Sequence, residues 1–242
     1  VVVGHFPAAS QVFILNLITG LMDLGHKVSI IALHKDTSLP VHPNVKKYKL
    51  MDRVKYSALS RKLPKCDIIF WQFGYLGKIL LVRQARFAQW LKNKKLVVCF
   101  RGSDTTSYVQ KDPKAYKQLF IKADLLLPVC DYFKQKLITL GCSSQKIAVY
   151  HSAIDSSKFF FTSRSKPKQG VINMVSVCRL VKKKGIDDAI RAFAEVSRKY
   201  PNLRFSIVGD GVERSYLELL VYQYGLQEKI TFHGWKSQDE IV

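Results

Sequence analysis

The stretch Asn173–Gly185, NMVSVCRLVKKKG, decides how the rest of the chain is interpreted. It begins as a Val-rich apolar run that predicts a buried strand ending at Arg179, and a short lysine loop then leads to Gly185. An amphipathic helix is predicted directly afterwards, because apolar residues recur there at helical spacing. These residues are Ile186, Ala189, Ile190, Phe193 and Val196.

A strand end, a turn and a helix start in succession suit the binding of phosphate. The N-terminus of a helix offers unpaired N–H groups and the positive end of its dipole. Arg179 and Lys184 would add two full positive charges at the same place. The alternative is a solvated lysine loop between two ordinary elements, because lysine runs commonly lie on the surface.

The composition indicates a packed, strongly basic protein. The 242 residues are 48% hydrophobic and predict one or two folded domains. The net charge is +21, and residues 1–158 contain 25 Lys and Arg against 9 Asp and Glu. Such a surface attracts nucleic acids, acidic phospholipids or phosphorylated small molecules, although a general lysine bias would give the same excess. No apolar run approaches the roughly 18 to 20 residues that span a bilayer.

The cysteines and histidines do not predict a metal site. Five cysteines are scattered without a CxxC pair, which favours reduced core residues of a cytosolic protein. The histidines lack ligand-like spacing, and capping or surface roles are expected for most of them, while His5, at the end of the first strand, could face the cleft.

The first half begins as a β-α-β unit. Strands are expected at residues 1–6 and 28–33, with an amphipathic helix between them that Ser10 caps and Gly25 ends. The loop Pro7-Ala8-Ala9-Ser10 follows the first strand, where open parallel sheets bind ligands. This loop is not a GxGxxG motif, so it does not specify a dinucleotide.

Strands and helices continue to alternate, which predicts a parallel sheet covered on both faces. Residues 35–63 are less regular and basic and are expected at the surface. Further strands are expected at residues 67–71, 95–100, 125–129 and 147–150, and helices at 76–91, 113–121 and 131–141, the last capped by Asp131.

The turn Arg101-Gly102-Ser103-Asp104 follows a predicted central strand. Arg101 and Asp104 could bind a substrate hydroxyl or phosphate there. The structural alternative is that Asp104 forms an N-cap or Asx turn, with Arg101 as its ion-pair partner.

Residues 159–170 are polar and rich in Lys, Ser and Pro, and they suit a linker between domains at 1–158 and 171–242. The second domain repeats the alternation, with helices at 186–200 and 213–224 and strands at 203–208 and 229–233. It is short for a doubly wound domain, which usually needs on the order of 100 to 150 residues. The chain is therefore expected to start within a strand and to stop inside its second domain.

Five segments, in order along nearly the whole chain, resemble retaining glycosyltransferases of the large glycosyl transferases group 1 family, of the type that builds surface polysaccharides. They are FPAASQVFILNLITGLMDLGHKVSI, HSAID, VCRLVKKKGIDDAIRAF, FSIVGDGVERSYL and ITFHGW. The resemblance implies an α/β fold of GT-B type, with two Rossmann-like parallel-sheet domains that face each other across a cleft, the second incomplete here.

The resemblance also implies a sugar transfer with retention, from a nucleotide-diphosphate sugar to a glycan or lipid-linked acceptor, without a required metal or other cofactor. Arg179 and Lys184 would neutralise the leaving diphosphate. The implied donor-side residues are Arg179, Lys184, Gly185, Gly209, Asp210, Gly211, Trp235 and Lys236. The implied acceptor-side residues are Ala8, Ala9, Ser10, Arg101 and Asp104.

Two departures from the family pattern matter. Many relatives carry His at the position of Arg101, and arginine cannot accept a proton at neutral pH, which argues against a base role there without implying inactivity. The family's pair of glutamates that touches the donor would lie beyond Val242, so the chain alone is expected to be inactive.

Two other functions remain open. The basic first half could bind polyanions or an acidic membrane without transferase activity, or could place the enzyme on the inner face of the plasma membrane. Binding of nucleic acid is disfavoured, because the aromatic residues fall inside apolar runs and not in an exposed series.

Overall fold

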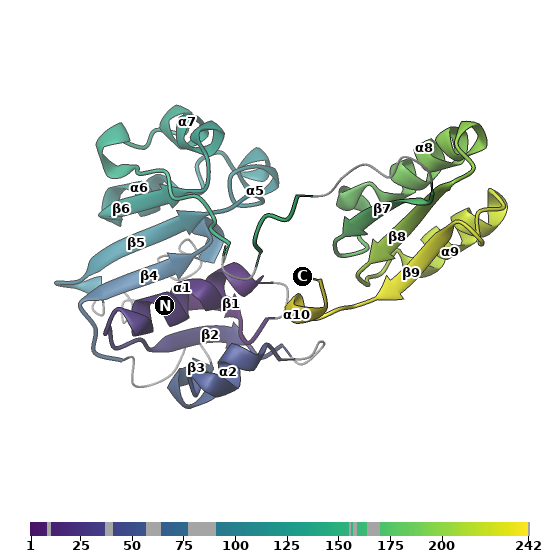
Figure 1. The fold of residues 1–242 in the computed structure, drawn as a ribbon. Coiled ribbons are helices and arrows are strands. Elements are labelled where there is room, and N and C mark those ends of the chain that lie inside the picture. The colour runs from purple at the N-terminus through teal and green to yellow at the C-terminus, as the bar shows by residue number, and fades with distance from the viewer. Residues whose placement is uncertain are drawn as a thin grey trace. The chain divides into compact units, whose positions relative to one another are not determined.

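The computed structural model describes residues 1–8, 11–36, 41–56, 64–76, 91–154, 156, 159–163 and 170–241. The chain folds into two compact units, Val1–Ile154 and Asp155–Val242. Each unit has its own parallel sheet and its own hydrophobic core (Figure 1), which confirms the predicted α/β class. None of the described helices is both long and apolar enough to cross a membrane.

The first unit contains a six-stranded parallel sheet in the order β3-β2-β1-β4-β5-β6. The order reverses between β1 and β4, and ligands of open α/β sheets bind beside the carboxyl ends of strands at such a reversal. The strands are β1 (Val2–His5), β2 (Ile30–His34), β3 (Val54–Tyr56), β4 (Ile68–Gln72), β5 (Lys95–Phe100) and β6 (Leu125–Pro128).

Helices cover both faces of this sheet, as the alternation predicted. Val3 and Ile30 lie in one core cluster with α1, α2 and the 3-10 turn η2, whereas Val2 and Ile31 lie in another with α5, α6 and α7. Neighbouring residues of a strand point to opposite faces, which explains this division. The elements are α1 (Val12–Asp23), α2 (Pro43–Lys47), η2 (Leu50–Arg53), α5 (Ser107–Lys111), α6 (Lys117–Lys122) and α7 (Asp131–Thr139).

Two expectations for the first unit were wrong. The segment 35–63 contributes α2, η2 and β3, and both Val45 and Leu50 are buried. Their few apolar residues pack against α1 and β2, a long-range contact that local composition does not reveal. Residues 147–150 form no strand, because only Ile147 makes a β-bridge, with Leu126.

The helix ends also differ in detail from the expectations. Cys130, and not Asp131, is the N-cap of α7, and Asp131 is the first helical residue. Residues 113–121 do not form one helix, since α6 starts at Lys117 and α5 precedes it. Gly25 does end the first helix, with φ 85°. Ser10 and most of the predicted helix 76–91 lie outside the described residues.

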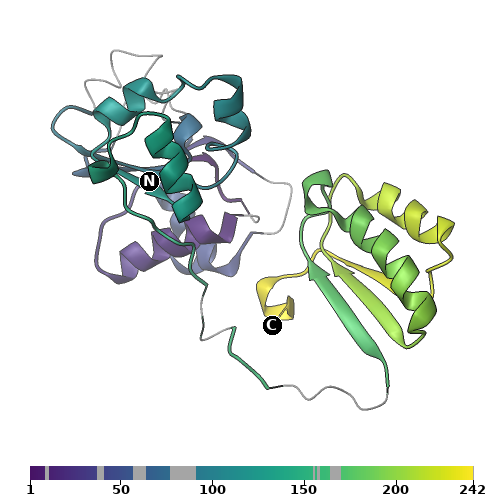
Figure 2. The ribbon, with the colours of Figure 1, turned by 90° about the horizontal axis from the view of Figure 1, so that it is seen from above.

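The second unit contains a three-stranded parallel sheet in the order β7-β8-β9. Figure 2 shows α8 and α9 on the same face of this sheet. Their apolar sides pack against Phe205 and Ile207 of the central strand. The elements are β7 (Ile172–Val177), η4 (Lys182–Lys184), α8 (Ile186–Lys199), β8 (Leu203–Val208), α9 (Arg214–Gln223), β9 (Ile230–Gly234) and α10 (Gln238–Ile241).

The expectation that β7 is buried was wrong. Val175 and Val177 are 59% and 50% exposed, because they lie on the face of the sheet opposite to Phe205 and Ile207, against which α8 and α9 pack. Val196 was expected on the buried face of α8 but is also exposed, whereas Ala194 and Ser197 are buried instead.

Candidate functional site

The loop after β7 is fixed to the loop after β8. Leu180 is fully buried, and its N–H donates to the carbonyl oxygen of Asp210 at 2.9 Å. The Leu180 carbonyl in turn accepts the N–H of Glu213 at 3.0 Å. These two bonds place the residues on either side of Leu180 beside the Gly209-Asp210-Gly211 turn, at the carboxyl edge of the sheet.

The two glycines of that turn allow the two loops to touch backbone to backbone. A Cβ atom added at Gly209 would lie 1.8 Å from the carbonyl oxygen of Cys178, and one at Gly211 would lie 2.3 Å from that of Leu180. Gly209 also has φ 134°, and its N–H donates to the carbonyl of Gly234 after β9 at 2.8 Å. Three consecutive strand ends are thus held together, and only glycine fits at Gly209.

Arg179 and Lys184 both lie on the loop after β7, and both are exposed. Neither side chain has an ion pair or hydrogen bond with any residue that the structure describes. The turn is closed by the N–H of Lys184 donating to the Val181 carbonyl at 2.9 Å, and Gly185, with φ 65°, is the N-cap of α8. The predicted order of cation, turn and helix start is therefore present.

The neighbouring Lys182, unlike Arg179 and Lys184, already has an ion-pair partner. Its ammonium group pairs with the carboxylate of Asp187, whose side chain is almost completely buried in the first turn of α8. Arg191 also donates to Asp187, at 3.2 Å, and to the hydroxyl of Tyr216 on α9 at 3.0 Å. The Lys182 hydrogen bond, and secondarily Arg191, lowers the pKa of the Asp187 carboxyl. The network ties the lysine turn to both helices.

Arg214 is a residue of this edge that sequence reasoning missed. Its guanidinium pairs with Asp210 at 3.2 Å and with Glu218 at 2.8 Å, and a Cβ at Gly234 would lie 3.5 Å from its Nη1 atom. The spacing Asp210, Arg214, Glu218 is a signal for consecutive i,i+4 pairs. Since Arg214 offsets the charge of Asp210, and Lys182 that of Asp187, the positive charges of Arg179 and Lys184 are not cancelled by these two carboxylates.

The residues after β9 are the last of those expected on the donor side. Trp235 is 38% exposed and follows Gly234, which has φ 69°. The ammonium group of Lys236, another expected donor-side residue, pairs with Glu240 at 3.0 Å. Glu240 also accepts the N–H of Ser237 at 2.8 Å. The hydrogen bonds from Ser237 have the largest effect and the contact with Lys236 a smaller one, and together they lower the pKa of Glu240 to about 2.

In the first unit, Asp104 organises the turn after β5. It is fully buried, and its carboxylate accepts backbone N–H groups from Gly74 at 3.1 Å, Arg101 at 3.0 Å and Gly102 at 2.8 Å. Burial raises the pKa of this carboxyl in spite of these hydrogen bonds. Asp104 therefore has a structural role, although it forms neither an N-cap nor an Asx turn, because its carboxylate accepts from residues that precede it. Its side chain has no surface through which to contact a substrate.

The guanidinium of Arg101 does not pair with Asp104, so that part of the structural alternative was wrong. Its Nε donates to Gln72 at 3.1 Å, its Nη1 donates to Ser152 at 2.9 Å, and the group lies 4.3 Å from the ring centroid of Phe13. Ser152 belongs to the HSAID segment, so Arg101 joins the ends of two strands to the segment that leaves the unit. Ala8 is half-buried, and Ala9 and Ser10 lie outside the described residues.

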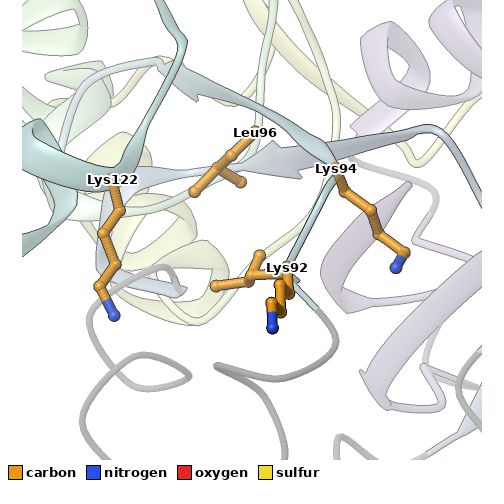
Figure 3. Close-up of a pocket in the computed structure, with 5 residues that line it drawn as sticks. Lys92, Lys94, Leu96 and Lys122 are labelled. Atoms are coloured by element: carbon orange, nitrogen blue, oxygen red, sulfur yellow. The ribbon is translucent and has the colours of Figure 1, made fainter.

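A cavity of about 260 Å³ lies elsewhere in the first unit (Figure 3). Its described lining is Leu91 and Leu96 with three lysines, Lys92, Lys94 and Lys122. Leu96 is near the start of β5 and Lys122 ends the helix before β6, so the cavity is at the amino edge of the sheet, opposite Arg101. It does not coincide with any residue expected to bind substrate.

The described cysteines and histidines form no metal centre. The five cysteines are free thiols, two of them buried, and no group of three or more His, Cys, Asp or Glu within the described ranges could hold an ion. His42 caps α2 by accepting the N–H of Asn44 at 3.2 Å, as expected for a capping histidine. His5 and His34 pack against each other at the ends of β1 and β2, with ring centroids 5.1 Å apart.

Known proteins resemble the chain in both sequence and fold. It is 28% identical to the putative colanic acid biosynthesis glycosyltransferase WcaL of Salmonella typhimurium, and 26% to the amylovoran biosynthesis glycosyltransferase AmsK of Erwinia amylovora. Each match covers 98% of this chain and 70% of the relative. The fold resembles that of Anabaena HepE in complex with UDP-glucose, with a TM-score of 0.66, 14% identity, and coverage of 98% of this chain and 69% of HepE.

Family models match both units. The model described as Glycosyl transferases group 1 matches residues 156–242, and the model described as Glycosyltransferase Family 4 matches residues 10–158. The second of these alone spans more than half of the chain, and its end coincides with the start of the first. The fold class of the structural neighbours is GT-B. The chain therefore belongs to Glycosyltransferase Family 4, with a second unit of the Glycosyl transferases group 1 type.

Proposed function

We propose that this protein transfers a hexose, with retention, from a nucleotide-diphosphate sugar to a glycan or lipid-linked acceptor during polysaccharide synthesis. The observation that carries the proposal is the carboxyl edge of the second sheet. Its three strand ends are held together, and Arg179 and Lys184 are exposed there without a described carboxylate partner, while Asp187 and Asp210 are paired. The chemistry of the relatives supports the same class of reaction.

In this reaction the bond between the anomeric carbon and the diphosphate oxygen breaks, and an acceptor hydroxyl forms the new glycosidic bond. Negative charge develops on the leaving diphosphate. Cations on a backbone that is already in place stabilise such charge with little reorganisation of the loop during the reaction. Arg179 offers a planar donor fork and Lys184 a point charge, and the N-terminus of α8 adds its dipole. We assign the nucleoside to the side of Trp235.

The proposal is tested by calorimetric titration of the full-length protein with UDP-glucose, GDP-mannose and ADP-glucose. One of the three is expected to bind with heat released and a 1:1 stoichiometry, and UDP-glucose is favoured because HepE binds it. The corresponding free nucleotide diphosphate should compete, since the diphosphate carries the main contact. Absence of binding by all three sugar nucleotides, with the protein folded by circular dichroism, contradicts the proposed donor site.

A peripheral membrane location is proposed as a companion to this function. The specific observation is the amino-edge cavity, in which three lysines surround two leucines, since such a surface can bind both the head group and the chain of an anionic lipid (Figure 3). The chain is expected to sediment with vesicles containing 30 mol% phosphatidylglycerol. Charge reversal of Lys92 and Lys122 to glutamate should halve the bound fraction, whereas reversal of Lys27 and Lys49 should not.

Equal sedimentation with pure phosphatidylcholine vesicles, or equal loss in both pairs of variants, contradicts the membrane proposal. The first result would show that charge is not involved, and the second that only total charge matters. Neither result bears on sugar-nucleotide binding, which is measured without lipid.

A further inference from the structure

We propose that the carboxyl edge of the first sheet contains a subsite for a negatively charged sugar. Arg101 would bind the anion, Gln72 would hold the Arg101 side chain in place, and an aromatic rim, defined as Phe13, Phe73 and Tyr75, would pack against the sugar ring. The inference rests on the proposed transferase function, whose acceptor it assigns to a chemical class. Of these residues, only Arg101 was singled out by the sequence pattern.

The first observation is the charge of Arg101. Its guanidinium is half-buried, and its hydrogen bonds go to neutral groups, the amide oxygen of Gln72, the hydroxyl of Ser152 and, more weakly, the thiol of Cys99 at 3.9 Å. No carboxylate in the described part of the chain pairs with it. A guanidinium has five N–H donors, so further donors remain for a ligand, and carboxylates and phosphates match their geometry.

The second observation is Gln72, at the carboxyl end of β4. This side chain is fully buried, its Oε1 accepts from Arg101, and its Nε2 has no hydrogen-bond partner among the described residues. A buried donor without an acceptor is costly and rare in folded proteins. Gln72 is too deeply buried to reach a ligand itself, but its Oε1 fixes the Arg101 guanidinium. The guanidinium has donors and no acceptor, which favours a ligand group that only accepts, such as a carboxylate or phosphate.

The third observation is the aromatic rim. The ring of Phe13 lies beneath the Arg101 guanidinium and 6.4 Å from that of Phe73, which stacks on Tyr75 at 5.5 Å. All three rings are half-buried, so each keeps a surface toward solvent. Flat apolar faces of this kind pack against the C–H face of a pyranose ring. A cation beside such faces selects a sugar that carries an anion.

The backbone of the rim is strained. Phe73 has φ 78°, a left-handed conformation that a bulky side chain rarely adopts and that concentrates at binding sites. Its N–H donates to the Cys99 carbonyl at 3.1 Å, and the next residue, Gly74, donates to Asp104. A Cβ at Gly74 would lie 2.2 Å from the ring of Phe100. The β5 turn thus holds Phe73 in this conformation.

The location agrees with the chemistry. Gln72 and Phe73 follow β4, and β4 adjoins β1 at the reversal of strand order, where α/β sheets bind ligands. The nearby carboxylate of Asp104 is turned inward onto backbone N–H groups, so it does not occupy the guanidinium. The cavity with three lysines is at the opposite edge and is a separate surface.

The test is a ligand-observed NMR titration with methyl β-D-glucuronide, glucose 1-phosphate and methyl β-D-glucoside. One of the two anionic sugars is expected to bind at least about tenfold more tightly than the neutral glucoside, as a charge-assisted contact would give. Binding of the glucuronide would identify a uronic acid as the charged sugar, and binding of glucose 1-phosphate would identify a sugar phosphate. Arg101→Gln should abolish the preference, and the matched Arg53→Gln, at an exposed arginine of the same unit, should preserve it.

A second variant separates binding from folding. Phe73→Gly removes the ring and tolerates the left-handed backbone, but the lost packing against the core should lower the midpoint of thermal unfolding. The titration is therefore made well below that midpoint, where the affinity for the anionic sugar should fall at least about fivefold. Equal affinity for all three sugars, or a charge preference that survives Arg101→Gln, overturns the subsite. UDP-glucose is titrated into the same proteins, so that failure of the donor site is seen independently.

Discussion

Gly209→Ala is expected to destabilise the second unit by about 4 kcal/mol or more, which is at the upper end of single substitutions. The added Cβ would lie 1.8 Å from the carbonyl oxygen of Cys178, and φ at this position is 134°. Neither strain can be relieved by a side-chain rotation, because both involve the backbone. Urea unfolding followed by circular dichroism measures the change.

Two other glycines separate the causes of this loss. Gly211→Ala introduces a contact at 2.3 Å from the Leu180 carbonyl without a positive φ, whereas Gly225→Ala has φ 64° and open space around the new atom. The first should cost about 3 kcal/mol through overpacking and the second only about 1 kcal/mol through backbone strain. If Gly209→Ala is no more costly than Gly225→Ala, the loops after β7 and β8 are not in backbone contact.

This contact explains why the Gly-Asp-Gly turn and the Arg179 loop depend on each other. Leu180 is buried between them, so Arg179 and the lysine turn cannot move outward without breaking the bond from the Leu180 N–H to Asp210. A cation that binds a diphosphate must be held before the ligand arrives, because ordering it afterwards reduces the affinity. If Arg179 binds the donor as proposed, the two glycines are expected to affect donor binding through the position of the Arg179 backbone.

Local patterns in the sequence were sufficient for most of the fold. The strands β1, β2, β4, β5, β6, β8 and β9 were expected to within a few residues, because short apolar runs bounded by Gly, Pro and Asp are unambiguous in a β-α-β series. The segment with Val45 and Leu50 was missed, since its apolar residues are separated by lysines and other polar residues without a regular period. The exposure of the β7 valines was also missed, because a Val-rich run does not show whether helices cover one face of the sheet or both.

The sequence predicted which charged residues lie on the turns of the candidate site, but not which of them form ion pairs or hydrogen bonds with each other. The sequence marks Arg179, Lys182 and Lys184 as basic residues of one turn, but only the structure shows that Lys182 is paired with Asp187. Arg101 contacts Ser152, fifty-one residues away, and no local signal connects them. Gln72 did give a signal, because a polar amide at the end of the run DIIFWQ is out of place unless it has a partner.

Arg179→Ala and Lys184→Ala are each expected to weaken binding of UDP-glucose roughly 30-fold, or about 2 kcal/mol, the usual range for one charged contact. Both side chains are exposed and make no described contact within the protein, so neither change should alter the midpoint of thermal unfolding. Calorimetric titration of each variant, in 50 mM and 300 mM salt, measures the loss.

Lys183→Ala is the matched control for this pair. Lys183 is an exposed lysine of the same 3-10 turn, with the same charge and adjacent in sequence to Lys184. If a specific contact to the diphosphate holds the donor, Lys183→Ala should change the affinity less than about twofold, because the remaining effect is a screened, longer-range charge. If Lys183→Ala and Lys184→Ala weaken binding equally, the turn acts only through its total charge. The assignment of Lys184 to the leaving diphosphate would then be wrong, and Arg179 alone would have to carry it.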